Sequence, residues 1–247
     1  MIELFVQNAS LLILALFIMA FLYSSVGHGG ASGYLAVMAL FSIAPAVMKQ
    51  SALILNLGVS MISFLQFYRK GFFKWRNFWP FALASIPMSY LGSLWILSDS
   101  TYKKVLAICL FFAVLRIMFQ QKTKPSQKQV PLIAALMIGA IIGLISGMIG
   151  IGGGILLSPL ILLFAWANMK ETAAVSALFI FVNSLAGLIA VKNWVALEQQ
   201  NFVWMILASL IGGILGSSWG ANYASSKWIK YILGLVLIIA SLKLFFV

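Results

Sequence analysis

The chain has 247 residues, of which 63% are hydrophobic and 8% charged, and its net charge is +12. Soluble domains average about 45–50% apolar and about 25% charged residues, so this composition excludes a water-soluble globular protein and indicates a chain embedded in a lipid bilayer. The basic residues lie at the ends of apolar runs, where the positive-inside rule of membrane proteins explains them, so we expect no nucleic-acid partner.

The first half of the chain, residues 1–120, is predicted to be a transmembrane repeat. It opens with an apolar run at 11–40, which is longer than the about 20 residues that cross a bilayer and is interrupted by a glycine-rich segment. We expect a helix, a break and a shorter helix there. Three ordinary spans follow, at residues 51–68, 78–97 and 104–119, with a turn around Pro45 before the first of them.

The second half, residues 131–247, follows the same plan after a polar stretch at 121–130 that we predict to be a cytoplasmic linker. Its first apolar run, 131–164, is again overlong and is broken by glycines at 150–154. Three further spans are predicted, at residues 173–191, 202–223 and 228–246.

Alignment of the chain on itself indicates a duplication. Gly27, Gly29 and Gly30 match Gly150, Gly152 and Gly153 at a constant offset of 123 positions. The triplet at 91–93 matches 215–217 at an offset of 124, and Asn56 matches Asn183 at 127. The predicted fold is therefore an all-α polytopic membrane protein with two homologous halves of about four transmembrane helices each, the first helix of each half being broken at a glycine-rich segment.

The distribution of charge predicts the orientation of the first half but not of the second. Basic residues in the loop at 69–76 and in the central linker place both on the cytoplasmic side. In the second half Lys192 favours one orientation, and Lys227 with Lys230 favours the other. The halves are parallel if each broken segment crosses the membrane once, and inverted if it turns back as a re-entrant hairpin.

The two breaks are the strongest functional signal in the sequence. In lipid, irregular backbone is tolerated only where it is buried in protein or lines a cavity. A helix that restarts after a break has unpaired N–H groups in its first turn and exposes the positive end of its dipole. The breaks therefore predict a site for an anion near mid-membrane depth, formed without a basic side chain.

The alternative is that these glycines only allow helices to pack closely, as small residues often do in membranes. We expect that packing role for Gly139, Gly143, Gly147, Gly212, Gly213 and Gly216. The predicted substrate-binding residues are those of the two breaks and two paired asparagines: Gly27, His28, Gly29, Gly30, Ala31, Asn56, Gly150, Ile151, Gly152, Gly153, Gly154 and Asn183.

The polar members of this set have two possible roles each. His28 is the only histidine, and Ile151 occupies its position in the second break. It is either a residue that neutralises the anion or relays a proton, or a structural histidine held by hydrogen bonds. Asn56 and Asn183 either contact the substrate or tie helices together.

Acidic residues are nearly absent from the predicted interior. Glu3, Asp99, Glu171 and Glu198 all lie near span ends or loops, which disfavours a cation site. A single histidine without a nearby acid makes no catalytic triad, and no cluster of His, Cys and carboxylates suits a metal. We therefore expect no catalytic residues and no cofactor. A passive anion channel and an intramembrane enzyme are the alternatives to a transporter.

Two stretches of the chain resemble the sulfite exporter TauE/SafE family of bacterial membrane permeases. They are residues 25–33 (SVGHGGASG) and 147–159 (GMIGIGGGILLSP), and the first departs from the family pattern at His28 and Ala31. The resemblance covers essentially the whole chain. It implies a multi-pass protein of the bacterial inner membrane that exports sulfite, a sulfonate or a related organosulfur anion. Separately, we expect a coupling proton or ion as an additional partner. Alternating access would come from rocking of one half against the other. The oligomeric state is not fixed by the sequence.

Overall fold

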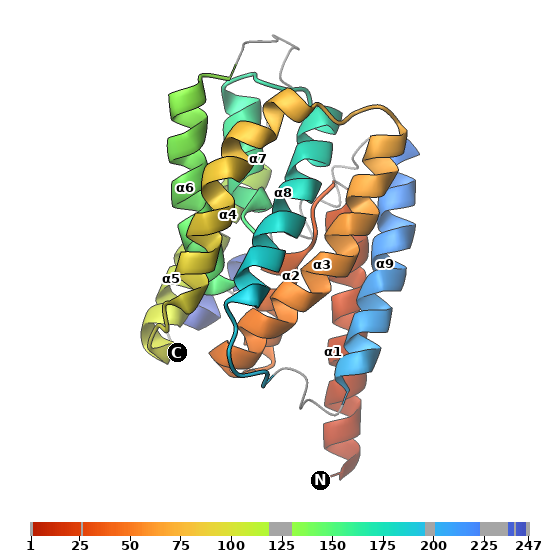
Figure 1. The fold of residues 1–247 in the computed structure, drawn as a ribbon. Helices are drawn as coiled ribbons and strands as arrows, with labels where there is room; N and C mark the ends of the chain where they lie inside the picture. Colours follow the sequence, from red (N-terminus) through yellow and green to blue (C-terminus); the bar gives the residue numbers. More distant parts are fainter. Residues whose placement is uncertain are drawn as a thin grey trace.

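A computed structural model describes residues 2–25, 27–118, 130–195, 201–222, 237–239 and 241–245. Every regular element in these residues is helical, which confirms the all-α class. The helices are α1 (Ile2–Ser25), α2 (Ala31–Leu40), α3 (Pro45–Arg69), the 3-10 helix η1 (Trp75–Asn77), α4 (Trp79–Leu94), α5 (Asp99–Met118), α6 (Leu132–Ile149), α7 (Gly154–Leu163), α8 (Met169–Ile189) and α9 (Phe202–Asn222). Figure 1 shows the long helices running between two ends of one bundle.

Four helices begin at least four residues earlier than the hydropathy pattern predicts: α1 at Ile2, α3 at Pro45, α5 at Asp99 and α8 at Met169. The predicted turn before α3 is confirmed at residues 41–44, but it ends earlier than predicted, since α3 begins at Pro45 rather than at residue 51. Proline is tolerated at the first helical position, where the N–H has no helical partner in any case. α8 begins at Met169 rather than 173, because Asn168 and Glu171 form a reciprocal capping box with two hydrogen bonds of 3.0 Å.

Glycines spaced four residues apart join the helices in two parallel pairs. On α6, Gly139, Gly143 and Gly147 lie against the backbone of α4 at Phe81, Ser85 and Ser89 in turn. On α9, Gly212, Gly216 and Gly220 lie against the backbone of α1 at Phe17, Phe21 and Ser25. A Cβ at any of the six would collide with the backbone of the facing helix. This confirms the packing role predicted for the glycines of α6 and α9, and it is the small-residue contact typical of membrane helices.

The pair α3 and α8 occupies the centre of the bundle and runs antiparallel (Figure 1). Near the start of α3, the Gln50 side chain donates to the Asn193 carbonyl just beyond the end of α8, at 2.6 Å. At the opposite end, Lys74 in the segment after α3 pairs with Glu171 in the first turn of α8. α9 packs on α3 and α4 packs on α8, so the two parallel pairs flank the central pair.

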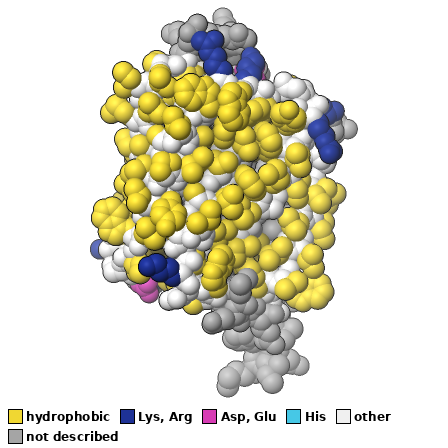
Figure 2. Space-filling view, viewed as in Figure 1, with side chains coloured by type: hydrophobic (Ala, Val, Ile, Leu, Met, Phe, Trp, Pro, Cys, Tyr) yellow, Lys and Arg dark blue, Asp and Glu magenta, His cyan; other side chains and the backbone are white. Residues whose placement is uncertain are grey.

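The outer surface of the bundle is apolar. Figure 2 shows one face on which hydrophobic side chains cover the middle and Lys and Arg gather toward the two ends. Large side chains such as Ile133, Met137 and Val203 are more than half exposed, an arrangement that water would penalise and lipid does not. Four of the described helices are long and apolar enough to cross a membrane: Pro45–Arg69, Leu132–Ile149, Met169–Ile189 and Phe202–Gly220. α2 and α7, with 10 residues each, are too short to do so.

Some predictions concern residues that the structure does not describe. The predicted linker at 121–130 lies outside the described residues except for Val130, and so do Glu198, Lys227 and Lys230. The last predicted span, 228–246, is described only at 237–239 and 241–245, which are helical.

Candidate functional site

Short glycine-containing connections separate α1 from α2 and α6 from α7. Gly27 and Gly30 have φ angles of 77° and 97° in the first connection, and Gly150, Gly152 and Gly153 have φ angles of 80°, 73° and 77° in the second. These angles lie in the left-handed region, where a side chain would strain the backbone. Glycine is therefore what allows the chain to turn between the two helices at both places.

The tips of the two connections meet at the same two side chains. A Cβ added to Gly29 would lie 2.8 Å from Asn56 Oδ1 and 2.9 Å from Ile180 Cγ2. A Cβ added to Gly152 would lie 2.8 Å from Asn56 Nδ2 and 2.8 Å from the same Ile180 methyl. Asn56 on α3 and Ile180 on α8 thus lie between two backbone segments that are 123 residues apart in sequence. We call Gly29, Gly152, Asn56, Ile180 and Ser184 the junction.

The short helices α2 and α7 both start at the junction. Their N-caps are Gly30 and Gly153, and neither is capped by a side-chain hydrogen bond. Gly154, the first residue of α7, lies against Ile180, so that a Cβ there would be 2.5 Å from the Ile180 side chain. The first N–H groups of each helix have no helical acceptor, and each helix contributes roughly half a positive charge at this end. Two positive helix ends therefore converge beside Asn56.

Asn56 is fully buried and only partly satisfied. Its Nδ2 donates to Ser184 Oγ on α8 at 3.3 Å. Its Oδ1 has no hydrogen-bond partner among the described residues. A buried amide oxygen without a donor is costly, and a hydrogen-bond donor such as water or a hydroxyl group would relieve that cost. Ser184 was not among the predicted site residues. Its only sequence signal is its position directly after Asn183.

His28 reaches from the first connection into the second half of the chain. It is buried, and its Nε2 lies 2.8 Å from Ser158 Oγ on α7. Ser158 in turn lies 2.8 Å from the Gly154 carbonyl oxygen and 2.7 Å from Ser176 Oγ. A serine has a single O–H to donate. If that hydrogen goes to the Gly154 carbonyl, Ser158 accepts from both His28 and Ser176, and the Nε2–H tautomer of His28 is selected.

The other predicted residues lie around this centre without joining the junction. Gly27 packs against Ala173 of α8, and Ala31 is buried as the first residue of α2. Gly150 lies on the backbone of Lys49, and Ile151 is buried. Asn183 is fully buried, but its Nδ2 donates to the Phe179 carbonyl of its own helix at 2.8 Å. Its own Oδ1 also has no hydrogen-bond partner among the described residues. The two asparagines that match in sequence therefore have different surroundings.

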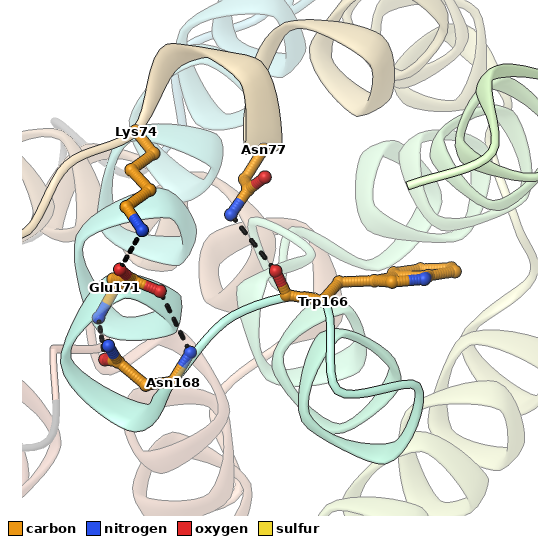
Figure 3. A network of polar contacts seen from close by, with 5 residues as sticks. All are labelled: Lys74, Asn77, Trp166, Asn168 and Glu171. Carbon is orange, nitrogen blue, oxygen red and sulfur yellow. Dashed lines mark hydrogen bonds and ion pairs between the residues drawn. The ribbon is translucent and has the colours of Figure 1, made fainter. Parts of the chain in front are cut away.

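The two carboxylates whose side chains the structure describes lie at the ends of the bundle and away from the junction. Of the acidic side chains that the structure describes, Asp99 is exposed at the start of α5 and Glu171 lies in the first turn of α8. Figure 3 shows Glu171 held by Lys74 and by the backbone of Asn168, beside the bond from Asn77 to the Trp166 carbonyl. Within the described part of the chain, no three His, Cys, Asp or Glu side chains are grouped as a metal would require.

Comparison with known proteins places the chain among membrane transporters. Residues 12–244 match the family described as "Sulfite exporter TauE/SafE". The chain is also 40% identical over 240 residues to a protein of Sinorhizobium fredii (strain NBRC 101917 / NGR234) named "Probable membrane transporter protein y4hK". That alignment covers 94% of this chain and 96% of the relative. No solved structure matches the chain.

Proposed function

Because the chain belongs to the sulfite exporter TauE/SafE family, we propose that this membrane transporter is a secondary exporter of a small anion, such as sulfite, a sulfonate or a related organosulfur anion. The anion binds at the junction, between the starts of α2 and α7. The protein works in the bacterial inner membrane as a multi-pass protein, and a proton or an ion couples the transport.

The observation that carries this proposal is the convergence of two uncapped helix N-termini on Asn56. Backbone N–H groups and helix dipoles bind anions without a basic residue. An oxyanion bound there could accept from these N–H groups. The unpaired Asn56 Oδ1 is itself an acceptor, so it would accept from a protonated form of the anion or from water and not from a bare oxyanion oxygen. A cation has no carboxylate to bind near this point, since the described acidic side chains are at the ends of the bundle.

We further propose that residues 1–120 and 131–247 are inverted repeats related by an axis in the membrane plane. The repeat assignment pairs α1 with α6, α3 with α8 and α4 with α9. Under this exchange the α1–α9 contact becomes the α6–α4 contact, and both are parallel pairs in close contact. The glycine series lie on α9 and α6, which the exchange does not equate, so the symmetry concerns the helix pairs and not their glycines. The central pair α3 and α8 is antiparallel, which inverted repeats require and parallel repeats do not. The loop after α3 lies on the cytoplasmic side, as its basic residues favour.

The close packing also bears on how the transporter would move. α1 belongs to one repeat and α9 to the other, and the same is true of α4 and α6. The repeats are therefore interleaved. If one repeat moved as a rigid body against the other, the glycine contacts between α1 and α9 and between α4 and α6 would both have to break. We propose instead that the moving units are the pairs α1–α9 and α4–α6, which shift relative to the central α3 and α8.

The experiment replaces Asn56 by Asp and measures sulfite efflux from loaded proteoliposomes. The N-termini of α2 and α7, which would attract the anionic substrate, would instead attract the carboxylate of Asp at position 56. At about 5 Å and an effective dielectric constant of 20, two like charges repel by about 3 kcal/mol, which corresponds to more than a hundredfold in affinity. At about ten times the wild-type KM, efflux by Asn56→Asp should therefore fall to roughly a tenth of the wild-type rate or less.

The matched control is Gln66→Glu, which makes the same change from amide to carboxylate on the same helix, ten residues and about 15 Å away. Its efflux should stay near that of the wild type. Undiminished efflux in Asn56→Asp would refute the site. Efflux that never proceeds against a gradient under any imposed proton or ion gradient would favour a passive channel, and a chemically altered product would favour an enzyme.

A further inference from the structure

A cavity of about 540 Å³ opens at the end of the bundle where α3 begins and α4 and α8 end. Its lining includes Lys49 and Gln50 of α3, Trp95 after α4, and Lys192 and Asn193 after α8. Met148, in the last turn of α6, also lines it. We call this cavity the vestibule. The proposed junction site does not account for it, and none of the lining residues was among the predicted site residues.

The vestibule borders the second glycine connection. Gly150, the first residue of that connection, lies so close to Lys49 that an added Cβ would be 2.9 Å from the Lys49 carbonyl oxygen and 3.0 Å from its Cγ. Gly152, two residues further along the same connection, is part of the junction. Lys49, which lines the vestibule, therefore touches the backbone segment that reaches Asn56 two residues further along.

Lys49 is placed to hold an anion in the vestibule. The residue is half-buried, and its Nζ donates to the Ser93 carbonyl at 3.1 Å. An ammonium group has three donors, so this bond fixes its position and leaves two N–H groups for another acceptor. Lys192 adds a second positive charge to the lining and Asp99 a negative one, so the charged side chains of the vestibule sum to a net positive charge. A cleft with excess positive charge concentrates anions.

The opposite end of the bundle is covered by the segment after α3. Phe72 and Phe73 pack there against Ala173, Ala174 and Phe67. Lys74 pairs with Glu171, and Asn77 donates to the Trp166 carbonyl at 3.3 Å, which ties this segment to the region where α7 ends and α8 begins (Figure 3). The structure therefore combines an open vestibule at the Lys49 end with a covered surface at the Lys74 end.

We propose that the vestibule is the outward mouth of the anion path and that Lys49 is a binding residue for a compact oxyanion between the junction and the aqueous phase. This inference rests on the proposed function. It adds a second binding point, on the side opposite the basic loops, from which the exported anion leaves. An oxyanion with several acceptor oxygens, such as sulfite or the head of a sulfonate, matches the two remaining N–H donors of Lys49.

The test compares Lys49→Met, Lys49→Arg and Lys104→Met in proteoliposomes oriented so that sulfite or methanesulfonate is offered to the vestibule side. Lys104 is the control because it is an exposed lysine near the start of α5, at the same end of the bundle, and does not line the vestibule. Lys49→Met should raise the KM for uptake from this side by roughly tenfold or more. Lys49→Arg should retain most of the affinity, and Lys104→Met should leave KM unchanged.

A second variant, Ala46→Trp, keeps the proposal testable if Lys49→Met fails to fold. Ala46 is exposed and lines the vestibule, so a large side chain there should obstruct it and reduce flux. Wild-type flux with unchanged KM in Lys49→Met, or full flux in Ala46→Trp, would refute the proposal that the vestibule is part of the anion path. Neither result would contradict the junction site. A wild-type protein that carries no anion at all would instead refute the proposed function, and with it this inference.

Discussion

Replacing Gly152 by alanine tests whether the junction requires a residue without a side chain at this position. Gly152 has a φ of 73°, and Gly71, in the turn after α3, has a φ of 74°. The two positions impose the same conformational demand on alanine. They differ in their surroundings, because a Cβ at Gly71 would meet no heavy atom within 4 Å, whereas one at Gly152 would meet the side chains of Asn56, Ile180 and Ser184.

The expected magnitudes follow from these two contributions. Alanine in the left-handed region costs about 1–2 kcal/mol, and this cost is common to both variants. At Gly152 the added Cβ would lie 2.8 Å from Asn56 Nδ2, 2.8 Å from Ile180 Cγ2 and 3.1 Å from Ser184 Oγ. Overpacking of this kind costs about 1–3 kcal/mol. We therefore expect Gly71→Ala to lose about 1–2 kcal/mol of unfolding free energy and Gly152→Ala about 2–5 kcal/mol.

The assay measures unfolding of both purified variants in the same lipid–detergent mixture, together with sulfite efflux after reconstitution. Gly152→Ala should unfold more readily than Gly71→Ala and should lose efflux even where it remains folded, because the added methyl group displaces Asn56. Gly71→Ala should transport like the wild type. Equal losses of stability in the two variants would show that the tight contact of Gly152 does not contribute to stability. Full efflux by Gly152→Ala would show that this contact is not required for transport.

Two further predictions concern packing and charge. Gly143→Ala should lower the unfolding free energy by about 1–3 kcal/mol or more, because its Cβ would collide with the Ser85 backbone on α4. Gly187→Ala should be neutral or stabilise α8 by up to about 1 kcal/mol, because its Cβ would make only an ordinary 3.4 Å contact with the Leu53 side chain. Unfolding of both variants in detergent measures the difference, and the reverse order of stability would contradict the α4–α6 contact. Lys74→Met should lower stability more than Glu171→Gln, because it leaves the Glu171 carboxylate, whose side chain is only 10% exposed, without its cation, whereas glutamine at position 171 can still accept the hydrogen bond from the Asn168 N–H. Thermal unfolding at low and high salt measures the difference between the two variants, which salt should reduce. Equal losses of stability would argue against a role for the ion pair.

The sequence predicted the properties that depend on one segment at a time. The apolar fraction and the length of the runs indicated helices in lipid, because lipid leaves each segment to satisfy its own backbone hydrogen bonds. The small size of Gly139, Gly143 and Gly147 indicated close helix packing, and the structure confirms it by placing all three against the backbone of α4. The start of α3 at Pro45 was missed, because Pro45 was assigned to a turn and Lys49 and Gln50 weaken the hydropathy signal, whereas proline is tolerated at the first position of a helix.

The candidate site depended on contacts between distant segments, which no local pattern contains. Asn56 and Asn183 match in sequence, yet only Asn56 lies between Gly29 and Gly152. His28 has no counterpart in the second break, and its contact with Ser158 could not be read from either segment alone. Lys49 resembled a basic residue at the end of a span, and its position beside Gly150 emerges only when α3 packs against the end of α6.

By itself, the sequence determined that this protein is embedded in lipid, that it is helical and where its glycine-rich segments lie. These properties follow from hydrophobicity and backbone freedom, which belong to individual residues. The tertiary structure decided which helices pair across the two halves, that α3 and α8 run antiparallel, and which polar groups share the centre. Those outcomes depend on the packing of all helices at once: side-chain volume and glycine contacts on α1, α4, α6 and α9 fix where the two connections meet.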